Sequence, residues 1–123
     1  MLAGAPLIAF VSATDADRAR RFFRDVLGLS LVSESPFALE FDCAGTMLRV
    51  TLVDKMAPAP YTVLGWQVND IATMVQSLAE AGVKLERYDG MAQSDDGIWS
   101  APSGARVAWF KDPDGNVLSI SQF

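Results

Sequence analysis

The alternation of apolar and polar positions predicts a strand and then a helix at the start of the chain. Residues 7–11 are apolar and suit a buried strand. Thr14, with Asp17 three residues later, offers a capping-box pattern for a helix start, and Gly28 is the expected helix end. Apolar side chains recur at helical spacing between these points, at Ala19, Phe22, Phe23, Val26 and Leu27.

Three strand-like runs follow this helix, and the whole order then returns in the second half. Residues 62–68 suit a strand, Asn69 or Asp70 is expected to cap a second helix, and Gly82 is expected to end it. The strand-like runs lie at 31–34, 37–41 and 47–53 in the first half, and at 83–88, 106–110 and 117–120 in the second.

One further short run, residues 98–100, has no counterpart in the first half. We expect it to pair with residues 106–110 through a turn at Pro102-Ser103-Gly104. The polar, glycine-bounded stretch 89–97 is expected to be a surface loop that could act as a flap.

The two halves correspond closely enough to predict an internal repeat within one domain. Asp15 and Asp70 both open a helix, and Gly28 and Gly82 both close one. The predicted organisation is a single α+β domain with module one at 1–53, a linker at 54–61 and module two at 62–123. The prolines of the linker favour an extended connector, which could let the modules pair within one chain or across two.

Composition narrows the classes of partner. The formal net charge of −5 argues against nucleic acid and against an anionic membrane surface. Cys43 is the only cysteine, so neither an internal disulfide nor a cysteine metal cluster can form. No run is long enough to span a membrane, and the short apolar start does not resemble a signal peptide, so we expect a cytoplasmic protein.

The repeat and two local sequences carry a resemblance to a known family. Phe22-Phe23-Arg24-Asp25-Val26-Leu27-Gly28-Leu29 ends the first helix, and Phe110-Lys111-Asp112-Pro113-Asp114-Gly115-Asn116 precedes the last strand. With two βαβββ units, the chain resembles the vicinal oxygen chelate superfamily of glyoxalases, bleomycin-resistance proteins and ring-cleaving dioxygenases. The resemblance implies paired modules that form a curved mixed sheet around a pocket.

Metal-dependent members of that family hold an ion with one ligand from each of four strands. Carried over to this chain, those positions fall on Ile8, Arg49, Val63 and Ser119. The chain has no histidine, and two apolar side chains, a cation and a hydroxyl cannot hold a divalent ion, so we expect no metal and no cofactor. A rebuilt site for a hard cation would have to use Glu40, Asp42 and Glu86.

Strand alternation then nominates the side chains that share a face with the former ligand positions. Arg49 is the most informative of them, because an inward arginine needs a partner. It could clamp a carboxylate or phosphate of a ligand, or it could form a salt bridge with Glu40 or Asp42. The predicted ligand-binding set, with Trp99 added from beside the loop, is Phe10, Ser12, Arg49, Thr51, Gln67, Trp99, Ser119 and Ser121.

The sequence therefore predicts a metal-independent small-molecule binding protein, similar to the drug-sequestering branch of the family. A metal-free isomerase or lyase acting on a carbonyl or carboxylate compound is the alternative, with Glu40 or Tyr88 as its base. A third possibility is an accessory module with a vestigial pocket. A homodimer is expected, because the edge strands of open sheets need cover.

Overall fold

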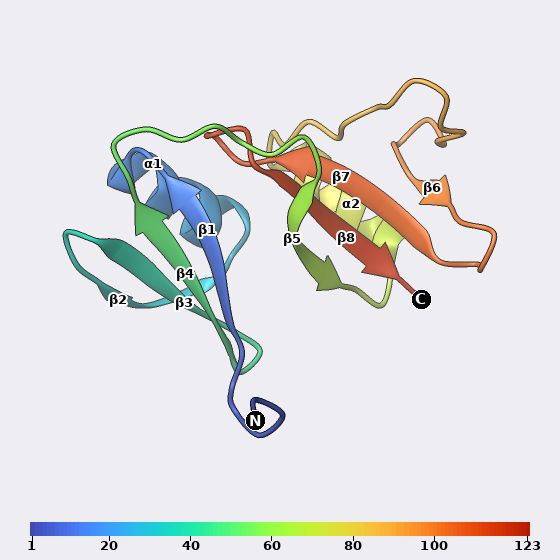
Figure 1. Cartoon of the computed structure of the whole chain (residues 1–123). Helices are drawn as coiled ribbons and strands as arrows, with labels where there is room; N and C mark the ends of the chain where they lie inside the picture. Colours follow the sequence, from blue (N-terminus) through green and yellow to red (C-terminus); the bar gives the residue numbers. More distant parts are fainter. The chain divides into compact units, whose positions relative to one another are not determined.

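The computed structural model describes all residues, 1–123, and the chain divides into two compact units, Met1–Ala57 and Pro58–Phe123. Each unit carries one helical segment and one four-stranded sheet (Figure 1). The division falls inside the stretch that the sequence marks as a linker. The predicted α+β class with two βαβββ-type modules is confirmed, and hydrogen bonding separates the strands into one sheet per unit.

The first unit follows the predicted order closely. Its sheet has the order β1-β4-β3-β2, in which β1 runs parallel to β4 and the other neighbours are antiparallel. The elements are β1 (Ile8–Ala13), α1 (Ala16–Arg20), η1 (Arg21–Val26), β2 (Ser30–Glu34), β3 (Ala38–Cys43) and β4 (Thr46–Leu52).

The first helix begins one residue later than the predicted capping box. Asp15, not Thr14, is the N-cap, and its carboxylate accepts the backbone N–H of Arg18. The last turns widen into a π-helix, in which the N–H of Leu27 bonds the carbonyl of Phe22. Two consecutive aromatic side chains, Phe22 and Phe23, are thereby both buried, with their rings edge to face at 5.1 Å.

The second unit repeats this topology, with the sheet order β5-β8-β7-β6. Asp70 is confirmed as the cap of its helix and accepts the backbone N–H of Thr73. Gly82 follows the helix with a φ of +87°, a conformation that favours glycine. The elements are β5 (Thr62–Gln67), α2 (Ile71–Glu80), β6 (Trp99–Ser100), β7 (Arg106–Lys111) and β8 (Val117–Gln122).

Two predictions for the second unit were wrong. Residues 83–88 do not form a strand, since only Leu85 makes an isolated bridge, to Phe110. The run at 98–100 does have a counterpart, because β6 pairs with β7 at the sheet edge as β2 pairs with β3. A short strand thus takes the place of β2, and the chain before it is a long irregular segment.

Each sheet buries one face under apolar side chains. In the first unit these belong to alternate residues such as Val11, Leu48 and Phe41, all at most 4% exposed. In the second unit Phe110 and Leu118 are fully covered, and Ile71, Val75 and Leu78 of α2 supply the buried stripe of the helix.

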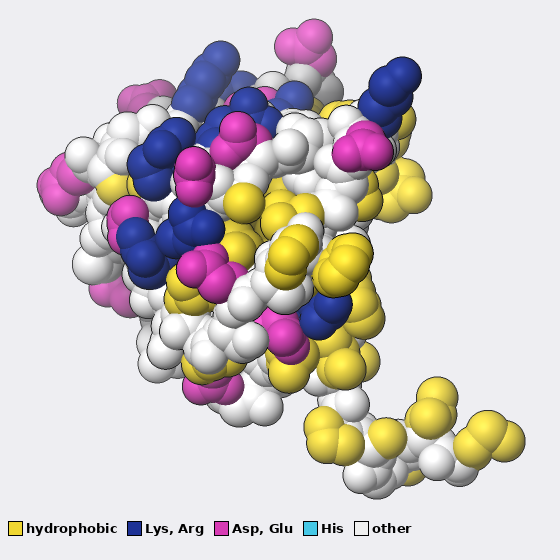
Figure 2. Space-filling view, turned by 90° about the vertical axis from the view of Figure 1, so that its left-hand side faces the viewer, with side chains coloured by type: hydrophobic (Ala, Val, Ile, Leu, Met, Phe, Trp, Pro, Cys, Tyr) yellow, Lys and Arg dark blue, Asp and Glu magenta, His cyan; other side chains and the backbone are white.

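The face of the molecule seen in Figure 2 carries charged side chains of both signs. In the view of Figure 2, lysine and arginine side chains are interspersed with aspartate and glutamate, and neither sign forms an extended patch. Neither helix of the structure has the length and apolar character needed to cross a bilayer.

Candidate functional site

The face of each sheet opposite the buried one carries most of the predicted ligand-binding residues. We name these faces by their residues. The open face of the first sheet comprises Ile8, Phe10, Ser12, Glu40, Met47, Arg49 and Thr51. The open face of the second sheet comprises Val63, Gly65, Gln67, Trp99, Val107, Trp109, Val117, Ser119 and Ser121.

The strand register of the two units agrees at two of the positions where the family holds its metal, Arg49 and Ser119. Arg49 of β4 lies opposite Phe10 of β1, and Ser119 of β8 lies opposite Gly65 of β5. Ile8 and Val63 each stand two residues before those β1 and β5 partners, but only Ile8 is paired across the sheet, with Met47, because the β5–β8 register shifts between Thr62 and Leu64.

The side chains at these four positions do not fit a divalent ion. Ile8 and Val63 offer hydrocarbon, Arg49 offers a cation, and the Ser119 hydroxyl is a weak single donor. The structure contains no group of three or more His, Cys, Asp or Glu side chains that could hold a metal ion. The carboxylates considered for a rebuilt site include Glu40 and Glu86, and both stand in ion pairs.

Arg49 and Glu40 face each other across β3 and β4, with 3.4 Å between Nη1 and Oε1. Their side chains are 33% and 24% exposed, so the pair stands at the surface of the open face. Of the two roles considered for Arg49, the salt bridge to Glu40 is therefore formed. Glu86 pairs in the same manner with Lys111, at 3.5 Å from Nζ to Oε1.

Ser119 is the most buried of the predicted ligand-binding residues, at 8% exposure. Its neighbour on β5 is Gly65, where an added Cβ would stand 2.8 Å from the Ser119 Oγ. The hydroxyl thus occupies the space that a side chain at position 65 would fill. Gln67 and Ser121 continue the polar line along the same two strands.

Three half-buried aromatic side chains meet on the open face of the second sheet. Trp109 of β7 makes ring contacts with both Tyr88 and Trp99. The Tyr88 and Trp109 rings meet edge to face with centroids 5.5 Å apart, and the Trp99 and Trp109 rings are tilted with centroids 6.2 Å apart. We call Tyr88, Trp99 and Trp109 the aromatic triad.

Only Trp99 of the triad was among the predicted ligand-binding residues. Trp109 could have been included, since it is the register partner of Ser119. Tyr88 was considered from the sequence only as a base for the alternative enzyme, because no local pattern places it beside Trp109. Burial raises the pKa of the Tyr88 phenol, and the charge of Glu86 adds to the effect, so the phenol stays protonated at neutral pH. Tyr88 is thus suited to donating a hydrogen bond, not to acting as a base.

The third tryptophan, Trp66, belongs to the opposite face of the same sheet. It stacks on Phe110, with centroids 6.5 Å apart and an interplanar angle of 16°. The second unit therefore places one tryptophan against Phe110 of the core and two on its open face. Trp66 can thus serve as an internal control when ligand binding to the open face is measured.

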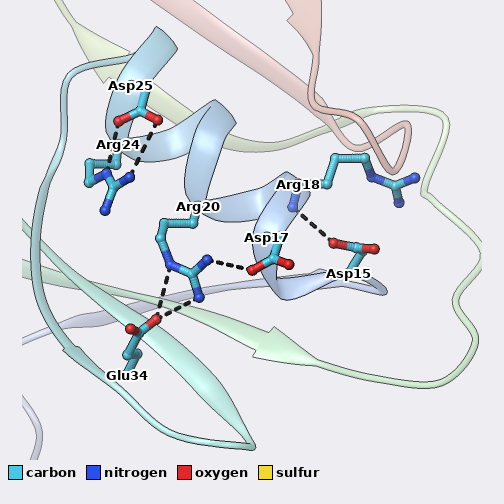
Figure 3. A network of polar contacts seen from close by, with 7 residues as sticks. All are labelled: Asp15, Asp17, Arg18, Arg20, Arg24, Asp25 and Glu34. Carbon is cyan, nitrogen blue, oxygen red and sulfur yellow. Dashed lines mark hydrogen bonds and ion pairs between the residues drawn. The ribbon is translucent and has the colours of Figure 1, made fainter.

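A charged network in the first unit has a structural role. The guanidinium of Arg20 joins Asp17 at 2.7 Å and Glu34 at 2.7 Å, and Arg24 pairs with Asp25 at 2.8 Å (Figure 3). Arg20 thereby connects α1 to β2. Its donors are directed at carboxylates of the protein itself.

A separate groove of about 620 Å³ runs beside α2 and involves none of the predicted ligand-binding residues. Its lining combines apolar side chains, such as Val75 and Leu85, with the charged Arg87, Asp95 and Asp96. Arg87 is engaged with the chain itself, because its guanidinium donates to the carbonyls of Ser94, Asp95 and Gln93.

Solved structures with this fold are similar over almost their whole length. A member of the glyoxalase/bleomycin resistance protein/dioxygenase superfamily from Sphaerobacter thermophilus is 22% identical, with a TM-score of 0.77 and 100% of both chains covered. A lactoylglutathione lyase from Agrobacterium tumefaciens is 21% identical, with a TM-score of 0.74 and coverage of 97% of this chain and 93% of that one. TnmS3, an antibiotic-binding protein from a Streptomyces species, is 23% identical, with a TM-score of 0.73 and coverage of 99% and 98%.

Sequence identities in this range show that the fold is shared, and they do not show a shared activity or ligand. No curated protein matches the chain significantly. A family profile described as the Glyoxalase/Bleomycin resistance protein/Dioxygenase superfamily matches residues 7–120. Since that match spans nearly the whole sequence, the protein belongs to the glyoxalase/bleomycin resistance protein/dioxygenase superfamily.

Proposed function

We propose that the protein is a metal-independent small-molecule binding protein that takes a planar, largely apolar ligand on the open face of its second sheet. The observation that carries the proposal is the aromatic triad beside the hydroxyl and amide groups of Ser119, Ser121 and Gln67. Binding sites for small molecules combine apolar and aromatic walls with a few placed polar groups.

The triad is suited to a flat ligand for a physical reason. Aromatic rings attract one another through offset or edge-to-face contacts beyond the effect of buried area. The contact of Tyr88 with Trp109 is edge to face, and the Trp99 and Trp109 rings are tilted relative to each other instead of stacked. The antibiotic-binding description of TnmS3, which has this fold, is in keeping with such a role.

Metal independence rests on the chemistry of the four former ligand positions. None of them offers a carboxylate, imidazole or thiolate, so a ligand would have to be held by packing and hydrogen bonds alone. The open face of the first sheet is the second proposed contact surface, through Phe10, Ser12, Arg49 and Thr51. There Arg49 would pair with an acidic group of a ligand only if that group replaced Glu40 in the ion pair.

A homodimer is part of the proposal. Ile8, Phe10 and Met47 expose 45%, 59% and 36% of their surface on the open face of the first sheet, and a second copy could cover them. Light scattering coupled to gel filtration tests this directly. A mass equal to that of one chain at micromolar concentration would exclude it.

Fluorescence titration with 1-anilinonaphthalene-8-sulfonate, a planar aromatic probe, tests the binding surface. Trp109→Leu is expected to weaken binding about tenfold, corresponding to roughly 1.4 kcal/mol of lost ring contact. Tyr88→Ala is expected to weaken it less. Tyr61→Ala is the matched control, because Tyr61 is exposed and belongs to no ring contact of the triad.

Equal affinity in the wild-type protein and in Trp109→Leu would contradict the proposed surface. Failure of the wild-type protein to bind any of a series of planar aromatic probes would favour a vestigial pocket. A requirement for added Zn²⁺, Ni²⁺ or Mn²⁺ would contradict metal independence.

A further inference from the structure

The segment that carries Tyr88 has almost no regular backbone pairing. Between α2 and β6 the chain forms only two isolated bridges, Leu85 with Phe110 and Gln93 with Trp99. The bridge of Leu85 contains the backbone bond from the N–H of Glu86 to the carbonyl of Trp109, which joins the segment to β7. Regular backbone pairing between strands therefore does not hold Tyr88 beside Trp109, and side-chain contacts must contribute.

A single side-chain amide supplies the missing hydrogen bonds. The Nε2 of Gln93 donates to the carbonyl of Glu86 at 3.0 Å and to that of Gly97 at 2.8 Å, and its Oε1 accepts the N–H of Tyr88 at 2.8 Å. Both donors of the amide and its acceptor are in use, and the contacts are partly buried. The three bonds join two passes of the chain, 86–88 and 97, that do not pair with each other.

The geometry around Gly97 explains how the second pass comes so close. Gly97 has a φ of +93°, and a Cβ built there would lie 3.1 Å from the Cβ of Leu85. A side chain at this position would push the turn away from Leu85 and lengthen the bond from Gln93 to the Gly97 carbonyl. Trp99 follows only two residues later.

From these contacts we infer that Gln93 is a positioning residue for ligand binding, which fixes Tyr88 and Trp99 against Trp109. This inference rests on the proposed function of the triad. The amide orders the surface before a ligand arrives, so the ligand does not meet the entropic cost of ordering it. The polar stretch 89–97, expected from sequence to be a possible flap, is then a held wall of the site.

Gln93→Glu and Gln93→Leu test this role with nearly unchanged volume. At neutral pH the carboxylate of Gln93→Glu cannot donate, and it sets a negative charge against two carbonyls; leucine removes all three bonds. The exposed Gln76, whose amide bonds only Glu80 on α2, gives the matched control Gln76→Leu. The readouts are the circular-dichroism exciton signal of the Trp99–Trp109 pair and the affinity for 1-anilinonaphthalene-8-sulfonate.

Both Gln93 variants are expected to lose most of the exciton signal and to bind the probe about tenfold more weakly at pH 7, while Gln76→Leu behaves as wild type. Acidification protonates the carboxyl of Gln93→Glu and restores one donor, so its exciton signal should recover on lowering the pH. Neither the wild-type protein nor Gln93→Leu should show such a recovery. A residue that acts only by filling space, without donating a hydrogen bond, would not produce this rescue.

The exciton signal needs no ligand, so the two proposals can fail separately. A wild-type protein that shows the signal but binds no probe would contradict the proposed function and leave the role of Gln93 to be read from the signal alone. An unchanged signal and affinity in Gln93→Leu would overturn the inference. Loss of the signal in Gln93→Glu without recovery on acidification would also overturn it.

Discussion

The two units of this protein share a topology, yet they complete their sheets in different ways. In the first unit β2, five residues long, pairs with β3 through backbone bonds. In the second unit the corresponding edge strand, β6, is two residues long, and side-chain bonds from Gln93 and Arg87 organise the chain before it. The aromatic triad lies at this edge, where regular pairing gives way to side-chain bonds.

The difference suggests how a repeated fold gains a binding surface in one copy. In a regularly paired strand, every second side chain lies on the same face of the sheet, so the backbone pairing determines where each side chain lies. An irregular segment held by a few side-chain bonds can bring a residue such as Tyr88 beside a strand residue such as Trp109. The first unit, with its complete β2, offers on its open face the ion pair of Arg49 and Glu40 and the exposed Phe10.

The largest expected effect compares a buried phenylalanine with an exposed one. Phe110 is 1% exposed and stacks on Trp66, whereas Phe10 is 59% exposed on the first open face. Phe110→Ala is expected to lower the free energy of unfolding by about 3–5 kcal/mol, and Phe10→Ala by about 0.5 kcal/mol or less. Urea denaturation measures both, and similar losses would show that the open face of the first sheet is in fact core.

The second comparison concerns the turns that join the last two strands of each unit. Asp112 is 5% exposed and accepts N–H groups of Asp114 and Asn116, including the Asn116 side chain. Asp42 accepts only the N–H of Gly45 at an exposed turn. Asp112→Ala should therefore cost about 1–3 kcal/mol of unfolding free energy, and Asp42→Ala about 0.5 kcal/mol, in the same denaturation measurement. Equal losses would remove the distinction between the turns.

The smallest effect is a difference in pH dependence. The backbone N–H of Thr73, helped by its hydroxyl, lowers the pKa of Asp70, so Asp70 contributes stability that is present at neutral pH and lost as the pH falls through its folded pKa. Burial raises the pKa of Asp112 despite its N–H donors, so its contribution is present in acid and lost as the pH rises through its folded pKa.

Urea denaturation at pH 7 and pH 3 separates these two carboxylates. When the pH is lowered from 7 to 3, the difference in unfolding free energy between wild type and Asp70→Asn should become smaller. Over the same change, wild type should gain stability relative to Asp112→Asn. Parallel behaviour of the two variants would show that burial does not control the titration of Asp112.

Much of the fold could be predicted from local sequence because its signals are local. The alternation in β1, where Val11 is buried and Phe10 exposed, and the cap at Asp70 each depend on residues a few positions apart. The positive φ of Gly28 and Gly82 ends both helices as expected. The start of the first helix differed by one residue because Asp15 and Thr14 are both competent caps.

The rest depended on contacts between distant residues. Residues 83–88 alternate like a strand, but their partners are a side-chain amide at position 93 and a single bridge at Phe110, which no local pattern reveals. Trp99 was predicted to bind a ligand because it lies beside the loop. The contact of Tyr88 with Trp109 depends instead on the segment that the Gln93 amide holds in place. The ligand-binding roles of all eight residues stay predictions: Phe10, Ser12, Arg49, Thr51, Gln67, Trp99, Ser119 and Ser121.

The central claim, that a ligand binds the open face of the second sheet without a metal, is tested most directly by the three tryptophan indole signals in an NMR titration. The titration uses 1-anilinonaphthalene-8-sulfonate in the presence of a chelator. We predict that the indole N–H signals of Trp99 and Trp109 move with the added probe while that of Trp66, stacked on Phe110, stays in place. Shifts confined to Trp66, equal shifts of all three, or shifts that vanish with the chelator would contradict the account.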